Sequence, residues 1–301
     1  MTGRSDPSAK RGGVANTNNQ EGGIRCMLAA AFFFSLMSVI VKIAGQRLPT
    51  AEIVFARSVV MLAISYVLVR RARIPLWGNR KSLLILRGVS GFGALFCFFY
   101  AITKLPLADI TVIHFTNPAF TAVFAAIFLK ESMRPVEALG LALCLAGVVL
   151  VAQPDFVFGE NARSLDLFAV GVAVAASILS SVAYTTVRKL GETDHHLVVI
   201  FYFPLVSIPA VLPLMAGRML LPTPVEWALL VGVGVVTFIA QVFLTKGLHR
   251  ERAGRAMSIS YIQVVFAVTW GLLFFNESPN IIAVAGAAVI FAGTFLVARR
   301  T

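Results

Sequence analysis

Long apolar runs separated by short polar turns dominate the chain. A helix needs about 20 mostly apolar residues to cross the hydrocarbon core of a bilayer, and ten runs meet or nearly meet that length. The turns between them are short and carry Gly, Pro and charge, so we expect consecutive helices to be antiparallel neighbours. The predicted spans are 24–44, 50–69, 83–103, 109–129, 135–151, 165–187, 197–216, 225–245, 253–274 and 281–298. The pattern predicts an all-α membrane protein.

Composition excludes a soluble globular protein. The chain is 58% hydrophobic and only 13% charged, whereas soluble domains run near one half and one quarter. Its net charge of +12 sits in short segments between apolar runs, so the expected partners are the bilayer and a small molecule, and no nucleic acid. The cysteines Cys26, Cys97 and Cys144 show no metal-binding spacing, so we expect no metal and no cofactor.

The positions of Lys and Arg predict the topology. If the ten spans are correct, 19 of the 26 basic residues lie on the face that holds the N-terminus, four lie on the other face, and Lys42, Arg57 and Arg87 lie inside spans. Loops rich in Lys and Arg stay in the cytoplasm, so both termini are predicted to be cytoplasmic. The protein itself is predicted to lie in the inner membrane of a bacterium. The polar segment 1–23 lacks an apolar core and is expected to be a disordered cytoplasmic tail.

The second half of the chain repeats the first. A shift of 146 residues, without gaps, aligns Gly45 with Gly191, Gly88 with Gly234, Gly140 with Gly286 and Gly147 with Gly293. The predicted repeats are 24–152 and 163–298. Each contains five helices, an odd number, so the second must enter the membrane from the opposite side. Inverted repeats are typical of secondary transporters, which bind substrate between the repeats near the bilayer midplane; they also occur in channels, and a duplication kept only for folding is the alternative.

One set of motifs resembles a known family. Residues 107–120 (LADITVIHFTNPAF) lead to 128–131 (FLKE), Gly140 and Gly147, and the second half echoes them with 254–261, 274–277 (FFNE), Gly286 and Gly293. Over residues 24–298 the chain resembles the EamA family of the drug/metabolite transporter superfamily and is similar to its bacterial aromatic amino-acid exporters. The resemblance implies that the first four helices of each half surround a central cavity and the fifth packs outside. It also implies metabolite transport, amino-acid export above all.

The fourth and ninth spans carry the first candidate substrate-binding residues. His114, Asn117 and Thr121 share one helix face, and Pro118 leaves the carbonyl of His114 without its helical donor. A substrate could donate to that carbonyl, or neighbouring helices could satisfy a simple kink. The ninth span offers Ser260 and Gln263 at the equivalent positions, with Tyr261 and Trp270 nearby. Both repeats are therefore expected to contribute to one pocket, with interhelical hydrogen bonding as the alternative.

Other spans add polar groups that need partners inside a membrane. Tyr100, Tyr184 and Gln241 are candidate substrate contacts because a buried hydroxyl or amide requires a hydrogen-bond partner. Arg57 lies roughly 10 Å from the external end of its helix, so it binds a substrate carboxylate or pairs with Glu52 or Asp109. Lys42 and Arg87 lie closer to span ends and are expected to extend to the interface.

One glutamate precedes the fifth helix in each half. Glu131 and Glu277 begin these turns, where Ser132 and Ser278 are expected to cap the following helices, so we predict capping and gating-hinge roles for Glu131, Glu277 and the kink at Pro118. The glycine pairs 140/147 and 286/293 lie on one face of each fifth helix, which favours close helix contact or dimerisation; a monomer or a homodimer is expected.

The sequence as a whole predicts an exporter of small metabolites, most simply amino acids, that works by alternating access. Uptake or exchange of a nucleoside or an S-adenosylmethionine-like compound is the alternative within transport. A channel or a receptor is the alternative from another class. The sequence contains no catalytic constellation, so an enzyme is not expected.

Overall fold

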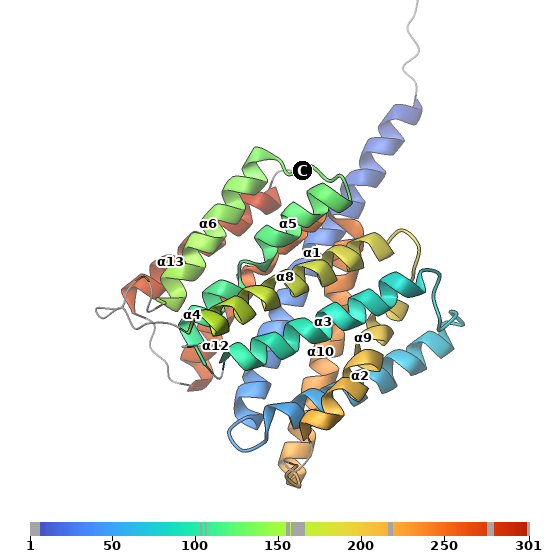
Figure 1. The fold of residues 1–301 in the computed structure, drawn as a ribbon. Helices are drawn as coiled ribbons and strands as arrows, with labels where there is room; N and C mark the ends of the chain where they lie inside the picture. The colour runs from blue at the N-terminus through green and yellow to red at the C-terminus, as the bar shows by residue number, and fades with distance from the viewer. Residues whose placement is uncertain are drawn as a thin grey trace, which may run out of the picture.

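The protein is a helical bundle. The structure, a computed structural model, describes residues 7–102, 104–105, 107–154, 157, 166–215, 219–275 and 280–299. Figure 1 shows the helices, which are α1 (Pro7–Ala44), α2 (Thr50–Arg71), α3 (Lys81–Ile102), α4 (Leu107–His114), α5 (Asn117–Phe128), α6 (Pro135–Ala152), α8 (Leu167–Leu190), α9 (His196–Met215), α10 (Pro224–Arg250), α11 (Ala253–Ser260), α12 (Ile262–Phe275) and α13 (Ile281–Arg299).

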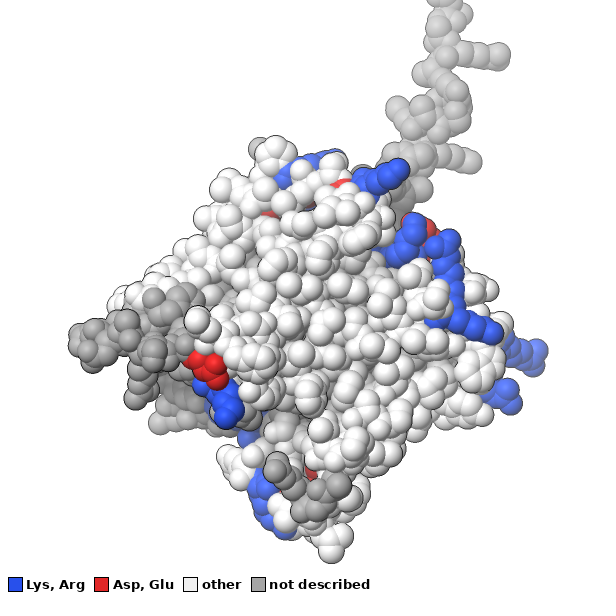
Figure 2. All heavy atoms as spheres, in the orientation of Figure 1, with Lys and Arg blue, Asp and Glu red and all other residues white. Residues whose placement is uncertain are grey.

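These helices supply the predicted membrane spans. Within the described residues, ten segments are long and apolar enough to cross a bilayer, which confirms the predicted number. Two of the ten are made of two helices each, α4 with α5 and α11 with α12. Figure 2 shows a broad uncharged band across the bundle, with Lys and Arg gathered at its upper-right edge and in a smaller group at its lower left. That distribution is expected of a protein surrounded by lipid.

The N-terminal helix is longer than predicted. We expected residues 1–23 to precede the first helix as a disordered tail, but α1 begins at Pro7, and the blue helix in Figure 1 extends beyond the bundle. Its apolar span starts at Gly22, close to the predicted start. A helix that is already nucleated adds residues at little further cost, so the polar segment from Pro7 onward continues α1.

The first membrane span begins and the last one ends on the same face of the bundle, which we call the terminal face. A Cβ at Gly23 of α1 would touch the side chain of Glu251, which lies between α10 and α11. Close by, Arg255 donates to the carbonyl of Val297 at 3.3 Å and to that of Ala298 at 3.2 Å, near the end of α13. An even number of crossings follows, as the sequence predicted.

The helix contacts have a pseudo-two-fold symmetry. Exchanging the halves replaces α1, α2, α3, α5 and α6 by α8, α9, α10, α12 and α13, and the reverse. Under this exchange the α1–α10 contact becomes α8–α3, the α2–α10 contact becomes α9–α3, and α1–α12 becomes α8–α5, and all of these contacts are present. The pairs α2–α9 and α6–α13 map onto themselves. The fold therefore consists of two five-helix repeats.

The fifth helices of the two halves cross through their glycines. A Cβ at Gly147 would lie 2.8 Å from the carbonyl oxygen of Gly286, and one at Gly140 would lie 3.0 Å from that of Gly293. Gly140 thus faces the later glycine of α13 and Gly147 the earlier one, so α6 and α13 are antiparallel and the repeats are inverted. The glycine face, for which the sequence allowed either a contact within the chain or a dimer contact, packs against the other half of the same chain. In Figure 1 this pair lies at one side of the bundle.

We predict that Gly147→Ala destabilises the protein by about 1–3 kcal/mol, because the added methyl meets backbone atoms that cannot move aside easily. Gly171→Ala on α8 is the control, since nothing lies within 4 Å of a Cβ there and alanine favours a helix. Thermal unfolding of the detergent-solubilised variants measures the difference. Equal midpoints for both variants would show that the α6–α13 crossing does not depend on close backbone approach.

Candidate functional site

Two broken helices meet at the centre of the molecule. The first break separates α4 from α5 at Phe115, and the second separates α11 from α12 at Tyr261, 146 residues later. The hydroxyl of Tyr261 donates to the carbonyl of Phe115 at 2.6 Å, and the two rings stack with centroids 5.8 Å apart. Equivalent residues of the two repeats thus contact each other, so the breaks lie on the pseudo-two-fold axis.

The first break is satisfied by its own side chains. The amide of Asn117 donates to the carbonyl of His114 at 2.8 Å, which supplies the donor that Pro118 removes. Ser181 of α8 donates to the carbonyl of Asn117 at 2.8 Å, and the hydroxyl of Thr116 lies 2.8 Å from that of Ser177. The sequence left open whether a substrate or the protein satisfies the His114 carbonyl, and in the structure the protein does. Within the described residues, the side-chain oxygen of Asn117 and Nδ1 of His114 are buried and have no hydrogen-bond partner.

A cavity of about 370 Å³ lies beside the breaks. That volume is within the usual range of small-molecule sites, about 300–1,000 Å³. Its lining comes from the first four spans of each half, while α6 and α13 contribute nothing. Eight pairs of lining residues are 146 apart in sequence: Phe34/Ser180, Met37/Ala183, Arg57/Phe203, Gly91/Thr237, Leu95/Gln241, Phe98/Leu244, His114/Ser260 and Asn117/Gln263. The pseudo-two-fold axis therefore passes through the cavity.

Six of the eight predicted substrate-binding residues line this cavity, namely Arg57, His114, Asn117, Tyr184, Gln241 and Gln263. Tyr100 and Trp270 do not line it. The ring of Tyr100 packs edge-on against Phe168, with centroids 6.0 Å apart. Trp270 donates to the hydroxyl of Ser35 at 2.9 Å and so links α12 to α1. The sequence shows which residues share a helix face, but not whether that face points to the cavity or to a neighbouring helix.

Arg87 is a charged cavity residue that was not predicted to lie there. It was expected to extend to the membrane interface, but its side chain is only 4% exposed and lines the cavity. Its helix face carried a usable signal, because Arg87, Gly91, Ala94 and Phe98 fall at i, i+4, i+7 and i+11, and all line the cavity. A Cβ at Gly91 would overlap the Arg87 guanidinium, so this glycine leaves the space that the arginine occupies.

Arg57 does not form the predicted pair with Glu52. The Glu52 carboxylate instead accepts from the backbone N–H of Leu220 at 3.2 Å, and the side chain of Asp109 lies outside the described residues. The guanidinium carbon of Arg57 lies 6.0 Å from the centre of the Phe203 ring, and that of Arg87 lies 5.0 Å from the same centre. One aromatic ring thus contacts both buried cations.

Glu131 joins the two halves at the terminal face. One carboxylate oxygen accepts from Nε of Arg188 at 2.7 Å, and the other accepts from the backbone N–H of Ala253 at 2.8 Å. Glu131 therefore caps α11, a helix of the other repeat, which differs from the predicted cap of its own helix. The residue before α6 is Arg134, with Glu137 accepting from its N–H, so the expectation for Ser132 was wrong. Glu277 lies outside the described residues.

Further contacts strengthen this terminal-face network. Arg252 forms an ion pair with Glu137 and donates to the carbonyl of Ser132 at 2.6 Å. Arg255 lies 3.4 Å from Glu251, a pair in which both side chains are almost fully buried. Burial raises the pKa of Glu251 above its ordinary value, and the charge of Arg255 opposes the shift.

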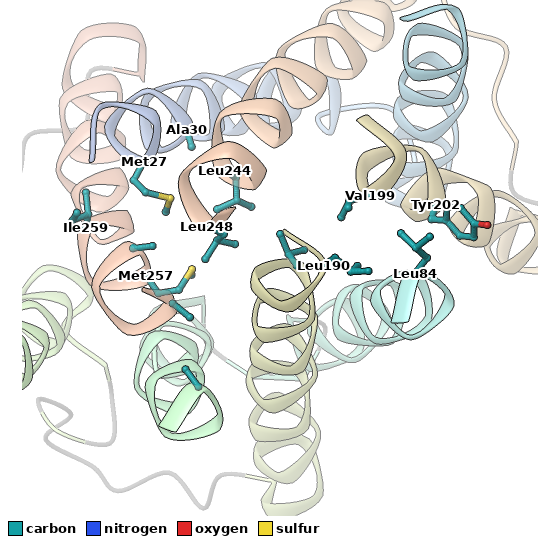
Figure 3. Close-up of a cluster of buried hydrophobic side chains, with 14 of the residues drawn as sticks. Met27, Ala30, Leu84, Leu190, Val199, Tyr202, Leu244, Leu248, Met257 and Ile259 are labelled. Atoms are coloured by element: carbon teal, nitrogen blue, oxygen red, sulfur yellow. The ribbon is translucent and has the colours of Figure 1, made fainter. Parts of the chain in front are cut away.

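A cluster of apolar side chains separates the cavity from the terminal face. Leu244 and Met257 belong both to the cavity lining and to this cluster. Figure 3 shows how it brings together side chains from both halves: Met27, Ala30, Leu84, Leu190, Val199, Tyr202, Leu244, Leu248, Met257 and Ile259. Toward the opposite face the buried apolar residues form several smaller clusters instead. Packing between the halves is therefore most continuous on the terminal side.

The chain is similar to membrane transport proteins. A model of the EamA-like transporter family matches residues 22–153 and 167–299. The pseudopaline exporter CntI of Pseudomonas aeruginosa is 33% identical over 278 residues, 92% of this chain and 96% of that protein. Solute carrier family 35 member G1 of Homo sapiens is 31% identical over 287 residues, 90% of this chain and 77% of that protein. A crystal structure with 18% sequence identity gives a TM-score of 0.80 over 92% of this chain and 98% of the other, a likeness of fold alone.

We predict that Tyr261→Phe destabilises the protein by about 1–2 kcal/mol, because the carbonyl of Phe115 loses its donor inside the bundle. Denaturant unfolding in detergent measures the change. Tyr66→Phe is the matched control, since Tyr66 is exposed toward the lipid on α2. If both variants unfold like the parent protein, the contact between the two breaks does not hold them together.

Proposed function

The chain belongs to the EamA-like transporter family, and from that premise we propose that it exports a small amino-acid-like metabolite across the bacterial inner membrane by alternating access. The single observation that carries the proposal is the central cavity, which lies on the pseudo-two-fold axis between two broken helices. Transporters built from inverted repeats bind their substrates in this position. A site equidistant from both faces can be opened to each in turn.

The cavity lining suits a compact molecule with charged and apolar parts. Arg57 and Arg87 offer guanidinium donors for an acid group, and Gln241 and Gln263 offer amides that can either donate or accept. Phe34, Phe98 and Phe203 supply an apolar wall. An amino acid or a derivative of one has groups for each of these surfaces. The relative named as a pseudopaline exporter supports the outward direction.

The contacts at the terminal face support a gating role for Glu131. Its ion pair with Arg188 and its cap on α11 cross from the first repeat to the second, and the apolar cluster of Figure 3 lies between them and the cavity. Because Lys and Arg predominate in loops on this face, we assign it to the cytoplasm. The structure then corresponds to a state closed toward the cytoplasm, and loading the cavity requires these contacts to separate.

We predict that Gln241→Ala and Gln263→Ala each lower substrate exchange about 10-fold, because each removes an amide that faces the cavity. Counterflow of radiolabelled amino acids and acidic derivatives in proteoliposomes measures the exchange. Tyr66→Phe, on the lipid-facing side of α2, is the control and should exchange at the parent rate. Undiminished exchange in both glutamine variants would remove this cavity from the transport path, and exchange of nucleosides alone would overturn the proposed substrate.

We predict that Glu131→Gln opens the cytoplasmic side more often, because it breaks the ion pair with Arg188 that joins the halves. The reporter is Met257→Cys in a background where Cys26, Cys97 and Cys144 are serine. Labelling by an impermeant maleimide in inside-out vesicles should become about 5-fold faster, as expected for a loss near 1 kcal/mol.

Lys189→Gln is the matched control for this experiment. It breaks the exposed ion pair of Lys189 with Glu192, which lies on the same face but within one repeat. Its labelling rate should equal that of the parent protein. Equal rates in the Glu131 and Lys189 variants would show that Glu131 does not hold the gate closed.

A further inference from the structure

Among the described residues, the cavity lining carries two positive charges and no negative one. Arg57 and Arg87 both line it, and no described lining residue is an aspartate or a glutamate. Arginine stays protonated at neutral pH, even where it is buried. Moving even one charged side chain to the centre of a bilayer costs about 2.5–3.5 kcal/mol on the most lenient scale, so two together require compensation.

The protein itself supplies little of this compensation. Neither guanidinium forms an ion pair or a side-chain hydrogen bond within the described parts of the chain, and Nε of each is buried without a partner. Two acidic residues of the described chain are used elsewhere, since Glu52 accepts from the backbone N–H of Leu220 and Glu131 pairs with Arg188. The ring of Phe203 contacts both cations, but a cation–π contact offsets only a fraction of the charge.

The two guanidiniums are close enough to act on one small molecule. Each lies within 6.0 Å of the same ring centre, so they cannot be further apart than those two distances added together. They come from different helices, α2 and α3, and both line the cavity with Phe203. A ligand with a single acid group pairs with one fork and leaves the other cation desolvated and unpaired, which is the costly arrangement.

We propose that the transported metabolite is a small organic anion with two acid groups, bound between Arg57 and Arg87. This inference rests on the proposed function and narrows its substrate class. Each guanidinium presents a planar pair of donors that matches a carboxylate or a phosphate. The amides of Gln241 and Gln263 then bind the remaining polar atoms of the substrate, and the aromatic wall covers its carbon chain.

The first test compares ligands that differ by one charge at nearly constant size. Succinate with succinamate and glutarate with glutaramate form such pairs, and glycerol 3-phosphate tests whether two charges on a single acid group suffice. Purified protein in detergent is titrated with each, and the shift in its unfolding temperature is recorded. We expect each dianion to bind at least about 10-fold more tightly than its amide partner. Equal binding within both pairs, or no binding by any dianion, overturns the inference.

The second test removes one charge at a time. Arg57→Met and Arg87→Met should each weaken dianion binding at least about 10-fold and abolish the preference over the amide partner. Arg57→Lys and Arg87→Lys should restore part of that preference, because they keep the charge without the planar fork. Arg70→Met, which removes an exposed arginine at the end of α2, should leave binding unchanged. A preference that survives both methionine variants overturns the inference, and if these variants fail to fold, the ligand pairs on the parent protein still decide.

Counterflow in proteoliposomes with the same ligands separates this inference from the proposed function. Dianions that bind and exchange support both. Dianions that bind without any exchange support the site and contradict transport. Exchange of glutamine and other neutral amino acids, with no binding or exchange of dianions, supports transport and overturns the substrate class. Binding and exchange of glycerol 3-phosphate alone, which has one acid group, supports transport and overturns the inference of two acid groups.

Discussion

The structure depends on one constraint, that inside a bilayer every backbone polar group and every charge must find its partner within the protein or its ligand. The two broken spans show how the chain meets it. At the first break the Asn117 amide satisfies the His114 carbonyl, and at the meeting point the Tyr261 hydroxyl satisfies that of Phe115. Because Tyr261 comes from the second repeat and Phe115 from the first, the second of these contacts forms only when the two halves are assembled. The cavity beside them is a consequence of that assembly.

The two repeats are alike in geometry and differ in charge. Eight pairs of cavity residues are related by the shift of 146, yet Arg57 corresponds to Phe203, and Arg87 corresponds to Val233, which is buried outside the lining. The first repeat thus supplies both cations, and the second supplies the ring that both contact. The terminal face shows the same division of roles, since Glu131 of the first repeat binds Arg188 and caps α11 of the second. The scaffold is therefore symmetric, but the charges that line its site are not.

Several features could be predicted from the sequence because they depend on short-range pattern. Apolar run length gives the spans, and the equivalent glycines give the repeat and a face for close contact on each fifth helix, which the structure shows to be the α6–α13 crossing. Six cavity residues could be named because a polar group in an apolar span needs a partner on the inner side. Trp270 and Tyr100 obey the same rule, but their partners lie elsewhere: Trp270 donates to Ser35 and Tyr100 packs on Phe168. The rule identifies the need for a partner and not the direction in which it lies.

The sequence by itself determined that the chain lies in a membrane, that it crosses the membrane ten times and that its halves are duplicated. The first two follow from the length of the apolar runs, and the third follows from the similarity between the two halves. The tertiary structure alone decided which charges are paired. Glu52 and Arg57 are only five residues apart in the sequence, but Glu52 accepts from the backbone of Leu220, and Arg57 lines the cavity together with Arg87. The second break likewise has no proline to announce it, since Val264 stands where the first repeat has Pro118. Both outcomes arise from contacts between residues over a hundred positions apart, which no local pattern records.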